Sequence, residues 1–296
     1  MSDRCAGPAA WDARLSSPGS PVCAPDWLAL REDADAAARA PELVGLLRAH
    51  LAAGARPGVP LVIRDLGCGT GSMGRWLAGR LPGPQVWVLH DRDPRLLASA
   101  VAGAPGRAAD GAPITARTQE GDLTDLRAAD LAGTALVTAS ALLDLLTAGE
   151  VDGLAAACTE AGAAALLTLS VTGHVELAPA DPLDAAFGSA FTAHQRRCVG
   201  GRGLLGPDAG AAAVDAFARR GAAVETRSSP WRLGADRAEL AEEWLRGWIG
   251  AACAQQPELE DHAAAYLRRR LDACTAGQLR VVVGHLDVLA LPSGGA

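Results

Sequence analysis

The chain has 296 residues, which is long enough for one large α/β domain with additions or for two modest domains. Its net charge is -7 and its pI is near 5.4, which disfavours nucleic acid as a partner because phosphate binding needs a basic patch. The first residues have no apolar signal core, and no stretch reaches the roughly 18 consecutive apolar residues of a membrane helix. We therefore expect a cytoplasmic protein without a membrane partner.

The basic residues and the cysteines indicate source and redox state. The chain has no lysine and is rich in alanine and glycine, which indicates a GC-rich bacterial genome. The cysteines are odd in number, widely scattered and without C-x-x-C or zinc-site spacing, so we predict reduced, mostly packed thiols and no metal site. They are Cys5, Cys23, Cys68, Cys158, Cys198, Cys253 and Cys274.

Residues 1–57 predict an irregular arm followed by a helical cap. The first part of this region contains Gly, Pro and Ser without periodicity. From Asp26 to about Ala53 the pattern is helical, and Pro41 divides it into two helices. We place the main domain at 58–296.

Strands and helices alternate in the first half of this domain. The strand-like runs are LVIRDLG, VWVLHD, ITARTQ, ALVTAS and AALLTLSV, with helical segments expected between them. This alternation predicts an α/β fold of the Rossmann-like kind, in which helices cover both faces of a mostly parallel sheet.

The pattern changes after Thr172. We expect a helical insertion at about 181–220, a sixth strand at AAVETRSS and a seventh at the C-terminal run LRVVVGHLDVLALP. A further helix begins near Asp236, and one of its faces carries apolar residues that we assign to the core. These are Leu240, Trp244, Leu245, Trp248 and Ile249.

The most informative residues are DLGCGTGSMG, which begin at Asp65 where the first strand meets a helix. Such a glycine loop lets a ligand lie against the backbone at the carboxyl end of the sheet. The glycines alone also fit the dinucleotide pattern GxGxxG, and Asp91 lies near the spacing of a ribose-binding acid.

Two acids separate these interpretations. Asp65 precedes the loop, where a carboxylate disfavours a pyrophosphate but suits a ligand that carries an ammonium and a sulfonium. Asp122 follows the third strand and could accept a hydrogen bond from an exocyclic amine.

DLGCGTG resembles motif I of class I S-adenosylmethionine (SAM)-dependent methyltransferases, HDRDP resembles the segment after it, and GDL resembles the acidic motif after strand three. The resemblance implies a SAM-binding domain at 58–296 with SAM as cofactor. In that family the glycine loop wraps the methionine portion, the acid after strand two holds the ribose hydroxyls and the next acid meets the adenine amine. Those roles fall on Asp65, Gly67, Cys68, Gly69 and Gly71, on Asp91 and Arg92, and on Asp122 and Leu123.

The chemistry of the reaction calls for few catalytic groups, because methyl transfer from a sulfonium expels a neutral leaving group. We expect Ser140 near the methionine moiety and Asp144 one turn beyond it. As general base we expect first His174 and then His194, and we count Asp144 with His174 among the catalytic residues. Arg31 and Arg39 could bind a substrate carboxylate.

The sequence therefore predicts a SAM-dependent methyltransferase that transfers a methyl group to an O- or N-nucleophile of a small molecule. The acceptor would lie between the glycine loop, the N-terminal helices and residues 181–202. Two alternatives stay open, namely an NAD(P)-dependent oxidoreductase and a SAM-binding protein without catalytic activity.

Overall fold

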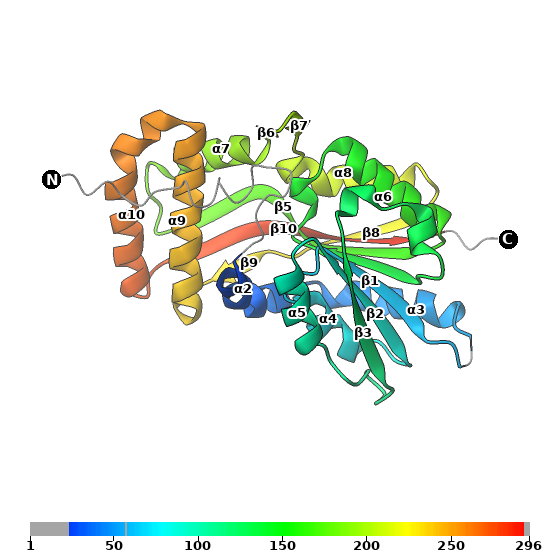
Figure 1. Cartoon of the computed structure of the whole chain (residues 1–296). Coiled ribbons are helices and arrows are strands. Elements are labelled where there is room, and N and C mark those ends of the chain that lie inside the picture. Colours follow the sequence, from blue (N-terminus) through cyan, green and yellow to red (C-terminus); the bar gives the residue numbers. More distant parts are fainter. Residues whose placement is uncertain (1–23, 57, 293–296) are drawn as a thin grey trace.

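The computed structural model describes residues 24–56 and 58–292 (Figure 1). The expected irregular arm, with Cys5 and Cys23, lies outside these residues. The two helices expected on either side of Pro41 are present. Each begins with a proline, Pro25 in the first and Pro41 in the second. The longer helices are α2 (Pro25–Ala38), α3 (Pro41–Ala53), α4 (Ser72–Leu77), α5 (Pro94–Ala102), α6 (Ala148–Glu160), α7 (Asp184–Gln195), α8 (Ala209–Ala218), α9 (Ala238–Gln255) and α10 (Glu260–Thr275).

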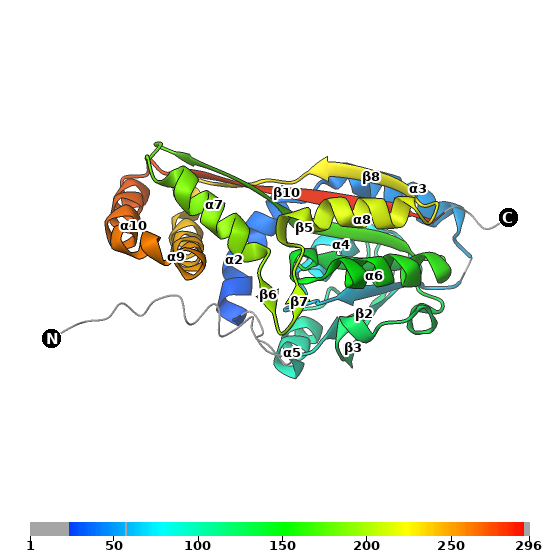
Figure 2. The same ribbon diagram turned by 90° about the horizontal axis from the view of Figure 1, so that it is seen from above.

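The strands form one large sheet and one small hairpin. The sheet strands are β1 (Leu61–Leu66), β2 (Gln85–Asp91), β3 (Ile114–Glu120), β4 (Leu136–Ser140), β5 (Ala164–Ala178), β8 (Ala223–Ser228), β9 (Trp231–Leu233) and β10 (Arg280–Leu291). The hairpin pairs β6 (Cys198–Val199) with β7 (Arg202–Gly203), and Figure 2 shows it projecting beyond the end of α7.

The sheet order is β3-β2-β1-β4-β5-β10-β8, and β10 runs antiparallel to β5 and β8. This mostly parallel arrangement confirms the expected α/β class. The chain moves outward from β1 to β3 and then restarts at β4 on the other side of β1, so the strand order reverses there. Ligands of open α/β sheets bind at such a reversal.

The expectation of seven strands is wrong by one, because the sheet has 8 strands. The sixth predicted strand ends at Ser228, and Pro230, which has no backbone N–H, interrupts it. The chain then pairs with β10 a second time as β9, since β10 is long enough to accept both segments.

Helices cover both faces of the sheet, with α6 and α8 on one face and α3 and α4 on the other (Figure 1). Between the first pair and the sheet lies a core that includes Leu154, Leu167 and Phe217. The opposite core includes Leu47, Trp76 and Trp87. The sheet is thus held between two packed layers.

A third core lies beside the sheet, where β5 and β10 run on past the parallel strands toward α7, α9 and α10 (Figure 1). It is rich in aromatic rings, and the rings of Phe187 and Tyr266 stack 4.5 Å apart. Trp244 and Trp248 of α9 are buried here, which confirms their assignment to the core.

Strand five is longer than its sequence pattern indicates. We expected it to end before Thr172, but it continues to Ala178. The additional residues pair with β10, and α7 packs against β5. The expected inserted helix is present as α7, and the helix after Gly206 and Pro207 is present as α8.

Candidate functional site

A cavity of about 450 Å³ opens at the carboxyl ends of β1, β2, β3 and β4. This volume is in the range of small-molecule sites. Many of the sequence-predicted cofactor residues line it together, although they are far apart in the chain. They are Asp65, Gly67, Cys68, Gly69, Asp91, Arg92, Asp122, Leu123 and Ser140.

The glycine loop after β1 forms the floor of the cavity. Gly69 has a φ of +54°, and a Cβ at this position would lie 3.1 Å from a methyl group of Leu28. The loop therefore requires glycine here both for its backbone conformation and for the space above it.

Several N–H groups of this loop already have acceptors in the protein. The Cys68 N–H donates to the carbonyl of His90 at 3.0 Å, and the Gly71 N–H donates to the carbonyl of Cys68 at 2.8 Å. The Gly69 N–H donates to Oδ2 of Asp91 at 2.9 Å. A pyrophosphate site needs such groups to be free for its oxygens, so this loop is poorly suited to a dinucleotide.

Asp91 ends β2 and connects that strand to the glycine loop. Its Oδ2 accepts from Gly69, and its Oδ1 accepts from the N–H of Asp93 at 3.0 Å. Each carboxylate oxygen has a second lone pair, so hydroxyl groups of a ligand in the cavity could still donate to it.

Asp65 lies at the end of β1 and is only 1% exposed. Burial raises the pKa of its carboxyl to about 7, against the opposing effects of the Thr138 hydroxyl and the Arg39 charge. Oδ1 accepts from Oγ1 of Thr138 at 2.7 Å, whereas Oδ2 is buried and has no partner among the residues that the structure describes. The cavity floor thus holds one open acceptor oxygen that favours a cationic donor.

Asp122 follows β3 on the far side of the cavity and begins a short helical turn. Its Oδ1 accepts from the N–H and the hydroxyl of Thr124 at 2.9 and 2.8 Å. Burial opposes ionisation, but these hydrogen bonds and the charges of Arg92 and Arg202 hold the pKa of Asp122 below its ordinary value. Asp122 is therefore an anionic acceptor beside Leu123.

Helix α2 forms one wall of the cavity. Leu28, Arg31 and Asp35 share one face of the helix and line the cavity together. A bidentate ion pair between Glu32 and Arg75, with both N···O distances at 2.6 Å, fixes α2 against α4. The spacing of Leu28, Arg31 and Asp35 could have indicated a shared helix face in the sequence. Of the three, only Arg31 was predicted as a site residue.

The β6–β7 hairpin supplies further wall residues that the sequence pattern did not single out. Val199, Gly200 and Arg202 line the cavity, and Arg202 forms a bidentate pair with Glu150 at 3.0 and 2.6 Å. This hairpin belongs to the region expected beside the acceptor. No sequence motif marks it, because its position depends on how α7 packs.

The structure does not bring all predicted site residues to the cavity. Gly71 lies in the loop but is not in the cavity lining, and a Cβ there would lie 3.2 Å from Cα of Ala100. Its left-handed φ of +87° therefore serves the packing of the loop on α5.

His174 is also outside the cavity, which corrects its prediction as a general base. It lies within the extended part of β5, its side chain is 57% exposed, and Nε2 is 2.9 Å from Oε1 of Glu176. The prediction placed it just beyond a strand end, but the strand continues past it. His194 is buried in α7 and does not line the cavity either.

Asp144 lies next to the cavity, between the lining residues Leu142 and Leu145. Burial raises the pKa of its carboxyl, and the charges of Arg31 and Arg197 oppose that shift. The Cys68 thiol is buried, and burial together with the nearby Asp65 charge raises its pKa, so it is not a nucleophile.

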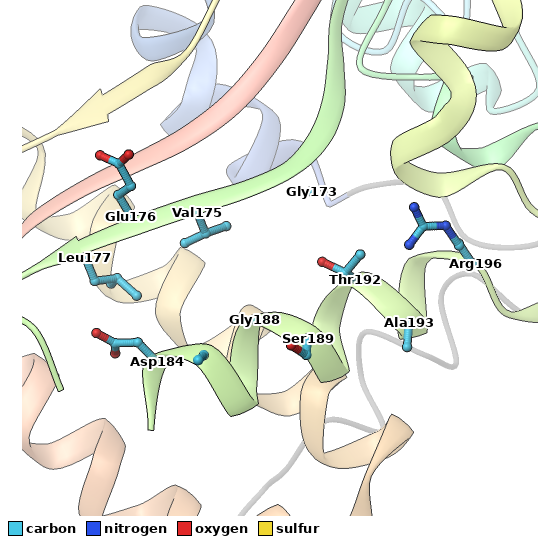
Figure 3. Close-up of a pocket in the computed structure, with 11 residues that line it drawn as sticks. Gly173, Val175, Glu176, Leu177, Asp184, Gly188, Ser189, Thr192, Ala193 and Arg196 are labelled. Carbon is cyan, nitrogen blue, oxygen red and sulfur yellow. The ribbon is translucent and has the colours of Figure 1, made fainter. Parts of the chain in front are cut away.

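A second, wider groove of about 870 Å³ lies between the extended part of β5 and α7 (Figure 3). Val175 and Leu177 face small residues of α7, such as Gly188 and Ser189. Asp184 lies at one end of the groove and Arg196 at the other. Asp184 forms an ion pair with Arg270, and Arg196 forms one with Asp208. We therefore assign the chemistry to the cavity at the strand ends.

Within the described residues, no group of three or more His, Cys, Asp or Glu side chains could hold a metal ion. None of the helices described is both long and apolar enough to cross a membrane.

Neither the known protein families nor the curated protein sequences give a match to this chain. Among solved structures, it is similar to the cyclopropane synthase MmaA2 from Mycobacterium tuberculosis, with 13% identity and a TM-score of 0.47 over 97% of this chain and 100% of that chain. It is also similar to magnesium protoporphyrin IX methyltransferase from Synechocystis PCC 6803 with bound SAH, with 14% identity and a TM-score of 0.41 over 85% and 83%.

A further similar structure belongs to echinomycin biosynthesis and concerns the conversion of a disulfide bond into a thioacetal group. There the identity is 18% and the TM-score 0.44, over 98% of this chain and 93% of that chain. At these identities and TM-scores the likeness indicates at most a similar course of the chain.

Proposed function

We propose that the chain is a SAM-dependent methyltransferase that acts on a small-molecule acceptor through an oxygen or nitrogen nucleophile. One observation carries the proposal: the N–H groups of Cys68, Gly69 and Gly71 in the glycine loop donate to protein acceptors, while Asp65 has a carboxylate oxygen on the cavity floor without a partner in the described residues. A loop of this kind suits a ligand with cationic groups better than one with phosphates.

The cavity provides acceptors for the rest of such a ligand. We assign the ribose hydroxyls to Asp91 and the adenine ring to Asp122 with Leu123, since all three residues line the cavity. SAM, when bound, supplies an activated methyl group. The chain then positions the acceptor and excludes water with α2 and the β6–β7 hairpin.

Asp144 is the remaining general-base candidate, because it adjoins the cavity and its pKa is raised toward the working range of a base. It would serve acceptors whose nucleophile carries an acidic proton. Asp144→Asn should lower kcat for such acceptors and remove the acidic limb of the pH–rate profile, whereas SAM affinity stays unchanged.

Isothermal titration calorimetry with S-adenosylhomocysteine (SAH), SAM and NAD(P)H tests the cofactor. We expect micromolar binding of SAH and SAM and no binding of NAD(P)H. The opposite result overturns the proposal in favour of an oxidoreductase. A protein that binds SAH but never turns over across a broad acceptor panel is the SAM-binding alternative.

A further inference from the structure

One buried carboxylate of β10 connects three segments that lie far apart in the chain. Asp287 is only 1% exposed. Its Oδ1 accepts from the N–H of Leu169 at 2.8 Å and from Oγ of Ser229 at 2.6 Å, and its Oδ2 accepts from the N–H of Ala40 at 2.8 Å. Burial raises the pKa of this carboxyl, and its three donors and the charge of Arg39 oppose that shift. A group that is costly to bury is thus satisfied by three segments at once.

Asp287 lies at a bulge between β10 and β5. The register of the two strands shifts between Leu286 and Val288, so that Asp287 faces two residues of β5 instead of one. These two residues are Thr168 and Leu169. Leu169 has a φ of +57°, in the left-handed region that non-glycine residues rarely adopt. Its N–H donates to Asp287 in this conformation, so the carboxylate stabilises the bulge.

A single peptide group connects this bulge to the end of β4. The peptide group between Thr168 and Leu169 donates its N–H to Asp287. The carbonyl of the same peptide group accepts from the N–H of Ala141 at 2.9 Å. Ala141 has a φ of +51°, and among the non-glycine residues that the structure describes only Ala141 and Leu169 have a left-handed φ. One chain of hydrogen bonds therefore supports both strained residues.

The turn at Ala141 shapes one wall of the cavity. Ala141 and Leu142 both line the cavity. A Cβ at Gly67 would lie 3.1 Å from two methyl groups of Leu142, so this leucine packs on the backbone of the glycine loop. With any other φ at Ala141 the chain would leave β4 in a different direction, and Leu142 would lose this position.

The second oxygen of Asp287 stabilises another wall. Its donor, Ala40, lies in the link between α2 and α3. The neighbouring Arg39 donates from Nη2 to Oγ of Ser72 at 3.2 Å and to Oγ of Ser140 at 3.0 Å. The end of α2 is therefore connected both to β10 and to the residues around the glycine loop. One carboxylate thus bonds to two segments that enclose the cavity.

We propose that Asp287 is a positioning residue for this cavity. Through Leu169 it holds the left-handed turn at Ala141, and through Ala40 it holds the end of α2. Asp287 is not part of the cavity lining, so it acts on a ligand only through these segments. The inference rests on the proposed function and deepens it, because binding of SAM and SAH would depend on a residue of β10.

Calorimetry with SAH on Asp287→Asn tests this role. The amide has one oxygen where the carboxylate has two, so it cannot accept from both Leu169 and Ala40. Without this support the turn at Ala141 relaxes, and the conformation that binds SAH is populated only in part. We expect SAH affinity to fall by about tenfold. Asp287→Ser replaces this variant if it does not fold, because serine places no amide against the Ala40 N–H.

Ser229→Ala is the matched control. It removes one hydrogen bond from the same carboxylate, but Ser229 does not line the cavity, and the bonds to Leu169 and Ala40 remain. Both Ser229→Ala and Asp287→Asn should lower the midpoint of urea unfolding. Only Asp287→Asn should weaken SAH binding by more than about twofold. Circular dichroism checks that each variant is folded.

Ala141→Gly separates positioning from a general loss of stability. Glycine adopts a left-handed φ without support from its surroundings. In proteins that carry Ala141→Gly, the change Asp287→Asn should therefore weaken SAH binding by only about threefold or less, instead of about tenfold. A loss of affinity that came only from a looser fold would be the same with and without Ala141→Gly.

The outcomes separate the two proposals. If SAH does not bind the wild-type protein, the proposed function fails, and the role of Asp287 fails with it. If SAH binds the wild type, three results overturn the positioning role alone. The first is an equal effect of Asp287→Asn and Ser229→Ala on SAH affinity, the second is an equal loss with and without Ala141→Gly, and the third is that neither Asp287 variant folds.

Discussion

The cavity and the aromatic core around α7, α9 and α10 both bury charged side chains, but they match these charges differently. In the aromatic core, Arg270 pairs with Asp184, and Asp184 also accepts from the Tyr266 hydroxyl at 2.5 Å. Beside the cavity, within residues 24–56 and 58–292, Arg39 forms no ion pair and one oxygen of Asp65 has no partner. Charges matched within the protein support the fold, whereas unmatched ones mark where a ligand is needed.

The largest effect is expected at the glycine loop. Gly69→Val places a β-branched side chain at a φ of +54° and within 3.1 Å of Leu28, so SAH binding should disappear in calorimetry. Gly79→Ala is the control, because no atom of the described part of the chain lies within 4 Å of a Cβ there. It should leave SAH affinity unchanged. Native SAH affinity in a folded Gly69→Val protein contradicts a cofactor site at this loop.

A second prediction concerns the cost of the unmatched Asp65. Burial raises its pKa from 3.8 to about 7, so its ionisation opposes folding, and the penalty is absent below the lower value and complete above the higher one. The free energy of unfolding should therefore fall with rising pH across this window, by about 4 kcal/mol at roughly 1.4 kcal/mol per pKa unit. Urea denaturation of Asp65→Asn should lack this contribution, so the free energy of unfolding of the wild type minus that of the variant should fall across the window, while the other carboxyls titrate in both proteins.

The same variant tests binding. SAH affinity of the wild type should rise as pH increases through about 7, because the ionised carboxylate accepts from the ammonium. Asp65→Asn should bind SAH more weakly and without this pH dependence. Parallel wild-type and variant profiles would show that Asp65 does not titrate in this range.

The third prediction addresses the matched charges. Asp184→Ala leaves Arg270 buried without a counter-ion, so the free energy of unfolding should fall by about 3 kcal/mol in urea denaturation. SAH affinity should not change. Asp236→Ala is the control, because the Asp236 side chain is 76% exposed and lies 3.5 Å from Arg237, so this pair should contribute within about 0.5 kcal/mol. Loss of SAH affinity in Asp184→Ala would contradict the separation of the two regions.

The residues around the glycine loop were accessible to sequence reasoning because each follows a strand. Asp65, Asp91 and Asp122 end or follow β1, β2 and β3, and parallel strands bring their carboxyl ends to one edge. Local patterns therefore located this side of the cavity, since the α/β alternation sets the geometry.

The rest of the candidate site could not be predicted from the sequence, because it depends on contacts between distant segments. Arg39 reaches Ser72 and Ser140 across 33 and 101 residues, and no local pattern encodes that distance. The prediction that His174 lies at the cavity failed for a related reason. Pairing with β10 extends β5 past His174, and the side chain points toward solvent. Long-range pairing can override a strand end that the local pattern indicates.

The smallest expected effect separates two roles of Asp91. Its carboxylate accepts a hydrogen bond from the Gly69 N–H and, in the proposed function, also accepts from ribose hydroxyls. Asp91→Ala should weaken SAH binding by tenfold or more, which corresponds to about 1.5 to 3 kcal/mol for charge-assisted hydrogen bonds, while circular dichroism shows an intact fold. The 2′-deoxy analogue of SAH should bind the wild type more weakly than SAH but bind the variant equally well. If the variant still distinguishes the two ligands as the wild type does, Asp91 only connects the loop to β2.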